Sequence, residues 1–151
     1  MYLRTLEDER KFRFHSISSE EKAEVIKLLT KALSKRREIL LAVIFGSFTF
    51  SGVFRDIDVA VFIGYAIPYD KVEQYEEELA LELESLVKKP VDVWVIDYAP
   101  PWFRVRALEG IVLIEKQPAL ATKMKFKALQ EINDLKAKIK KLKHLKTKGT
   151  P

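Results

Sequence analysis

The stretch GSFTFSGVFRDIDVAVF, residues 46–62, decides how the rest of the chain is interpreted. It follows the apolar run LLAVIF, which ends at Phe45, and it continues into the β-branched run IDVAVF. Both runs have the length and composition of buried strands. Because alternate residues of a strand point to the same side, Asp56 and Asp58 are expected to project together, with Ile57 turned to the core.

Two carboxylates placed this closely repel each other unless a cation lies between them. In proteins Mg²⁺ is held by one or two carboxylates together with substrate phosphates. Gly46 allows a close backbone approach, and the Ser47 hydroxyl with its neighbouring amides can contact a phosphate. The alternative is a hairpin turn in which Asp56 and Asp58 are solvated. The apolar strand on each side and the preceding Gly-Ser favour a metal and phosphate site.

A third carboxylate lies in the strand-like stretch VDVWVID, residues 91–97. Alternation puts Asp92 on the face opposite the valines, and an unpaired carboxylate in such an apolar strand is costly to bury. If this strand lies beside that of Asp58, the three carboxylates form a cluster able to hold two metal ions. Asp97, at the strand end, is interpreted as a turn or cap residue.

Across the whole chain, periodicity predicts elements in the order helix, strand, strand, helix, strand, helix, strand, long helix. Their expected ranges are 19–37, 40–45, 57–64, 70–87, 91–97, 102–109 (closed by Gly110), 111–115 and 118–146. This order predicts an α/β (α+β) fold with a small mixed sheet flanked by helices, not a series of repeating βαβ units. We expect one domain over 1–117 and a basic helical extension over 118–151.

Composition excludes several classes of protein. The 151 residues include no cysteine and only two histidines, which excludes disulfide frameworks and makes a multi-histidine zinc site untenable. No apolar run reaches the roughly 20 residues of a membrane span, and the N-terminal MYLRTLEDERKFRF lacks the apolar core of a signal peptide. We therefore expect a cytoplasmic protein. A single asparagine and the dominance of Lys and Glu are typical of thermophile proteins.

The net charge of +5 is concentrated in the C-terminal extension. Residues 119–148 hold ten lysines against two acids, a local net charge of +8, so the remainder of the chain carries −3. Ile132, Leu135, Ile139 and Leu142 follow a heptad spacing that suits a two-stranded coiled coil. The extension is thus a candidate for homodimerisation or for packing on a partner helix. Its lysines are also candidates for phosphate contacts with nucleic acid, although no aromatic or arginine side chain indicates base readout.

Taken together, these residues resemble the minimal nucleotidyltransferases, small members of the DNA polymerase beta-like superfamily. That family has a strand ending in Gly-Ser, a loop, D-x-D on the next strand and a third Asp in a later hydrophobic strand. Gly46, Ser47, Asp56, Asp58 and Asp92 match this pattern in order. The stretch PPWFRVRALEGIVLIE, residues 100–115, is similar to the end of the family's domain, so the resemblance covers about 20–117.

The resemblance implies a nucleotidyltransferase fold and metal-dependent transfer of AMP from ATP to an acceptor hydroxyl. It implies that Asp56 and Asp58 hold two Mg²⁺ ions, and that Asp92 binds the second ion and helps to deprotonate the acceptor. Gly46 and Ser47 would lie near the β- and γ-phosphates. Such domains often pair, as antitoxins, with a small helical HEPN partner, whose tyrosine hydroxyl is then the expected acceptor.

The chain departs from the family pattern in its loop. Family members usually carry an Arg-Gly pair shortly after Gly-Ser, whereas Thr49 is followed here by Phe50 and Ser51. Arg55, directly before D-x-D, is therefore a candidate phosphate clamp, since a guanidinium matches phosphate oxygens bidentately. Arg55 is equally a candidate counter-ion for Asp56 and Asp58 in a metal-free, catalytically silent module that acts by partner contact.

Overall fold

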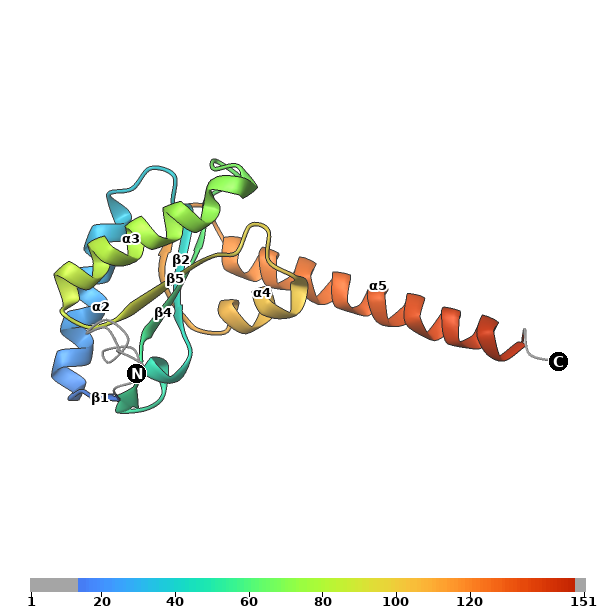
Figure 1. Cartoon of the computed structure of the whole chain (residues 1–151), viewed down its shortest axis with the longest axis horizontal. Coiled ribbons are helices and arrows are strands. Elements are labelled where there is room, and N and C mark those ends of the chain that lie inside the picture. Colours follow the sequence, from blue (N-terminus) through green and yellow to red (C-terminus); the bar gives the residue numbers. More distant parts are fainter. Residues whose placement is uncertain (1–13, 149–151) are drawn as a thin grey trace, which may run out of the picture.

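A computed structural model describes residues 14–148 (Figure 1). The N-terminal stretch that we interpreted as lacking a signal peptide lies, apart from Phe14, outside the described residues. The strands are β1 (His15–Ser16), β2 (Leu41–Phe45), β3 (Val53–Phe54), β4 (Ile57–Phe62), β5 (Val91–Val95) and β6 (Ile111–Glu115). The helices are α2 (Ser19–Ser34), η1 (Ser47–Thr49), η2 (Tyr69–Lys71), α3 (Val72–Val87), α4 (Pro101–Leu108) and α5 (Leu120–Lys148).

The main sheet is mixed, as predicted. Its strand order is β5-β4-β2-β6, in which β2 runs antiparallel to β4 and β6, and β4 runs parallel to β5. The parallel pair requires a crossover connection, which α3 supplies. Each helix and strand expected from the sequence is present. The structure adds a two-stranded ribbon of β1 and β3, which the sequence pattern did not indicate.

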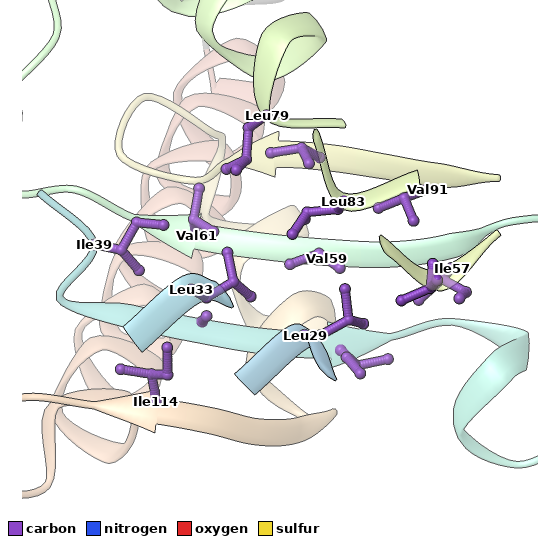
Figure 2. Packing of buried hydrophobic residues seen from close by; sticks show 14 of the residues in the cluster. Leu29, Leu33, Ile39, Ile57, Val59, Val61, Leu79, Leu83, Val91 and Ile114 are labelled. Carbon is purple, nitrogen blue, oxygen red and sulfur yellow. The ribbon is translucent and has the colours of Figure 1, made fainter. Parts of the chain in front are cut away.

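Both faces of the sheet are covered, which explains why the run LLAVIF is apolar at every position. Ala42 and Ile44 of β2 face the cluster formed with α2 and α3, whereas Leu41, Val43 and Phe45 face the one formed with α4 and α5. Figure 2 shows the first cluster, in which leucines of α2 and α3 pack over the valines of β4.

Strand β5 is an edge strand, and two of its outward N–H groups donate to side chains of α3. The backbone N–H of Val91 donates to Glu84 over 3.0 Å, and the N–H of Val95 donates to Glu76 over 2.8 Å. Burial raises the pKa of Glu76, while the hydrogen bond from Val95 opposes that shift. These two contacts fix β5, and with it Asp92, against α3.

Asp97 has the structural role expected of it. It is only 7% exposed, and its carboxylate accepts the backbone N–H groups of Ile63 (3.1 Å) and Tyr65 (2.7 Å). It therefore ties the loop after β4 to the end of β5.

Helix α5 packs on α4 through its first turns and then projects away from the body (Figure 1). Arg104 of α4 forms an ion pair with Glu131, and Glu109 forms one with Lys125 at 3.6 Å. Beyond these contacts the apolar heptad positions are open, with Ile139 53% exposed and Leu142 65% exposed. No helix within residues 14–148 is long and apolar enough to cross a membrane.

Candidate active site

Three carboxylates predicted to converge do so at one end of the sheet. Asp58 of β4 and Asp92 of β5 are directly opposite each other in the parallel register. Asp56 precedes β4 by one residue. Each of the three offers a carboxylate oxygen within 4.8 Å of those of the other two, and all three side chains are half-buried.

Asp58 is held from two sides. The indole N–H of Trp94 donates to its Oδ1 over 3.2 Å. On the other side lies Gly46, where an added Cβ would stand 2.5 Å from Asp58 Oδ2. Gly46 also has a φ of +82°, a conformation that residues with a side chain rarely adopt. The position therefore requires glycine both for its backbone conformation and for the space that Asp58 fills.

The electrostatics of Asp58 suit a cation site. Burial raises the pKa of Asp58, the hydrogen bond from Trp94 lowers it, the charge of Asp92 raises it further, and the charge of Arg106 lowers it. An all-carboxylate set of ligands is what hard divalent cations prefer. The residues present therefore fit a divalent metal ion, which would offset both the cost of burying these charges and their mutual repulsion.

A cavity of about 500 Å³ opens beside Asp58. Its lining residues come from the end of β2, the following loop, the start of β4 and the end of α4: Phe45, Gly46, Ser47, Thr49, Phe50, Asp58, Arg106, Glu109 and Gly110. Gly110 makes this arrangement possible, because a Cβ there would stand 2.0 Å from the Ile44 carbonyl oxygen. Without a side chain at that position, the end of α4 can lie against β2 and form one wall of the cavity.

The loop that carries Gly46 and Ser47 is fixed by contacts to α2 and to the core. The Lys22 ammonium donates to the Thr49 carbonyl over 2.9 Å, and the Thr49 hydroxyl donates to the Gly46 carbonyl over 2.7 Å. Phe48 is fully buried and packs edge-on against Phe54 at 5.0 Å. The cavity wall is thus shaped before any ligand arrives.

The predicted site residues lie in two groups. Gly46 and Ser47 line the cavity beside Asp58, and Asp56 and Asp92 lie in the carboxylate cluster. Arg55 is exposed and is not among the residues that line the cavity; its guanidinium lies 5.3 Å over the ring of Phe14. Its role toward phosphate or the carboxylates stays a prediction.

Two residues at the site were missed by sequence reasoning. Trp94 shares a strand face with Asp92, two positions away, and this alternation was a signal that it reaches the same site. Arg106 is brought to the cavity by the packing of α4, for which the sequence gives no local sign.

A family model described as "Polymerase beta, Nucleotidyltransferase" matches residues 27–119, well over half of the chain. The chain belongs to this nucleotidyltransferase family. The matched range spans β2, β4 and β5, and so contains all three carboxylates of the cluster. No curated protein matches the chain.

Solved structures similar to this chain include several from toxin–antitoxin systems. A mutant MntA–HepT toxin–antitoxin complex matches with a TM-score of 0.61 at 20% identity, over 80% of this chain and 93% of that chain. A toxin–antitoxin structure with AMP-PNP matches with 0.61 at 21% identity, over 80% and 94%. A Shewanella oneidensis structure of a tri-AMPylated HEPN toxin with an MNT antitoxin matches with 0.58 at 20% identity, over 83% and 95%. These similarities establish the shared fold.

Proposed function

We propose that this nucleotidyltransferase transfers AMP from ATP to a hydroxyl group on a HEPN-type helical partner, acting as the antitoxin of a toxin–antitoxin pair. The observation that carries the proposal is the convergence of Asp56, Asp58 and Asp92 beside the cavity lined by Gly46 and Ser47. Carboxylates that can hold metal ions, next to a cavity with room for a nucleotide's phosphates, are what in-line nucleotidyl transfer requires.

In this proposal Asp56 and Asp58 would hold two Mg²⁺ ions, with Asp92 as a further ligand. When bound, the ions neutralise charge on the attacking and leaving oxygens. The Ser47 hydroxyl and the backbone at Gly46 orient the β- and γ-phosphates in the cavity. Asp92 accepts the proton of the acceptor hydroxyl, whose oxygen then forms a bond to the α-phosphorus. The bond from that phosphorus to the pyrophosphate oxygen breaks, and pyrophosphate leaves.

The partner in this proposal is supported by the structural neighbours. They include an antitoxin in complex with a tri-AMPylated HEPN toxin and a complex that contains AMP-PNP. Both fit a reaction whose nucleotide is ATP and whose acceptor is a partner protein.

The function is tested by incubating the purified chain with α-labelled ATP, Mg²⁺ and a HEPN-type protein from the same genome. The expected result is label on the partner, dependent on the metal and removed from the partner by substitution of an acceptor tyrosine. If the partner binds stably but stays unlabelled, the chain is a silent binding module. If γ-labelled ATP labels the partner instead, the chain transfers the γ-phosphoryl group and the proposed transfer of AMP is wrong.

The exposed heptad residues of α5 suit a helical partner better than nucleic acid. We expect that Ile139→Ser with Leu142→Ser abolishes assembly with the partner, or homodimerisation, because these side chains are open in the structure and need burial. The matched variant replaces four lysines, at 138, 140, 141 and 143, by Gln and leaves the apolar positions intact. It should retain assembly.

Analytical ultracentrifugation at low and high salt provides the measurement. Assembly through the apolar positions should depend little on salt. If instead the lysine variant loses assembly, or nucleic acid binds with an affinity that falls steeply with salt, phosphate contacts dominate the extension.

A further inference from the structure

The cavity beside Asp58 contains one guanidinium, that of Arg106, which no protein carboxylate neutralises through an ion pair within residues 14–148. Arg106 is not part of any motif identified in the sequence. It is exposed at the end of α4, where Ala107 and Leu108 are buried and hold the helix against the sheet.

The other cations around the site are engaged. Lys22 donates to the Thr49 carbonyl and lies 5.3 Å from the centre of the Phe48 ring. Arg104, two residues from Arg106, forms an ion pair with Glu131 and also donates to the Ala99 carbonyl over 3.1 Å. Arg55 lies over Phe14. The positive charge that is available inside the cavity therefore comes from α4.

Besides Asp58, the residues that line the cavity include one carboxylate, that of Glu109, and it forms an ion pair with α5. Its Oε1 lies 3.6 Å from the Lys125 ammonium. This contact offsets the charge of Glu109 at the cavity wall. Arg106 lines the same cavity as Asp58, and its charge lowers the pKa of that carboxyl, by less than burial raises it.

A triphosphate bridging the carboxylate cluster and the Gly46–Ser47 loop would lie along this cavity. Its non-bridging oxygens would need a fixed cation in addition to the metal ions, and the loop, with Phe50 81% exposed at the cavity, supplies none. A guanidinium meets two phosphate oxygens at once through parallel N–H groups.

We propose that Arg106 contacts the β- and γ-phosphates of the bound nucleotide and supplies the charge that the loop lacks. This inference rests on the proposed function. It assigns the phosphate-binding role to the end of α4, and Arg55 then lies outside the phosphate site.

Calorimetric titration of the full chain with ATP and with AMP, each with Mg²⁺, tests the assignment. Arg106→Gln should weaken ATP binding roughly 10- to 100-fold, as expected for lost charged hydrogen bonds, and AMP binding much less. The ATP affinity of Arg106→Lys should lie between those of the wild type and Arg106→Gln, because lysine keeps the positive charge but lacks the two parallel N–H groups of the guanidinium. The matched control is Arg37→Gln, the same change at an exposed arginine near the other end of β2, which should bind ATP as the wild type does.

Titration with Mn²⁺ alone separates phosphate contact from a structural role. Removing a cation from the cavity that Asp58 lines should leave Mn²⁺ binding equal or tighter, whereas a distorted site would lose Mn²⁺ and ATP together. The assignment is overturned by unchanged ATP affinity in Arg106→Gln, by parallel loss of both ligands, or by Arg55→Gln showing the loss instead. If the wild-type chain fails to bind ATP, the proposed function is wrong as well. If the wild-type chain binds ATP and Arg106→Gln binds it equally well, only the role of Arg106 is wrong and the proposed function stands.

Discussion

Asp58→Asn is expected to lower nucleotidyl transfer by at least about 1,000-fold and to raise the melting temperature of the metal-free chain. The loss corresponds to removing several kcal/mol of transition-state stabilisation by metal-bound charge. The gain in stability follows because Asp58 is partly desolvated and faces Asp92, so its ionised form is unfavourable in the absence of a cation. Transfer of labelled AMP and thermal unfolding with and without Mg²⁺ measure the two effects.

The matched control is Asp97→Asn, which changes a buried carboxylate outside the cluster. Asn can accept only one of the two backbone N–H groups that Asp97 now satisfies, so this variant should lose stability and keep transfer. The wild-type chain should gain stability with Mg²⁺, whereas Asp58→Asn should gain little. Equal stabilisation of both chains by Mg²⁺ would contradict a metal site at Asp58.

Gly46→Ala is expected to lower transfer by about 100-fold, the scale of loss that follows a misplacement near 1 Å at a reacting centre. The new Cβ would stand 2.5 Å from Asp58 Oδ2, so either the carboxylate or the loop must move. The φ of +82° adds backbone strain of about 1–3 kcal/mol. Both the free energy of unfolding and the affinity for Mn²⁺ should therefore fall.

Gly52→Ala is the control for this change. A Cβ at Gly52 would meet the Ile17 carbonyl oxygen at 3.8 Å, an ordinary contact, and the backbone there has no positive φ. Gly52→Ala should therefore keep stability and transfer close to wild type. A Gly46→Ala chain that retains Mn²⁺ affinity would show that Asp58 is not positioned by this glycine.

The parts of the fold that the sequence predicted are those with long apolar or periodic runs. The run LLAVIF is buried on both faces, and VDVWVID alternates, so their strand structure follows directly from composition. The convergence of Asp58 and Asp92 was predictable for the same reason, since it needs only that their strands be neighbours. The ribbon of β1 and β3 was not predictable, because strands of two residues are too short to show a period.

Arg106 could not be assigned from sequence because its position depends on tertiary packing. The sequence shows two arginines in the short helix, Arg104 and Arg106, and both are polar residues on a helix with one buried side. Only the structure shows that Arg104 turns to α5 and Arg106 to the cavity. Gly110 is a related case: the sequence indicates a helix end, whereas the structure shows that a side chain there would collide with β2.

Two ion pairs join the C-terminal end of α4, which lines the cavity, to the part of α5 that packs on the body. Arg104 and Glu109, which flank Arg106 in sequence, are both tied to α5, a helix of 29 residues and thus about 44 Å in length. If a partner protein binds the exposed half of α5, as proposed above, a shift of that helix would reach Arg104 and Glu109 through these ion pairs. If the nucleotide proposed to bind at Arg106 and the partner proposed to bind on α5 are coupled through these residues, each must change the affinity of the other by the same free energy.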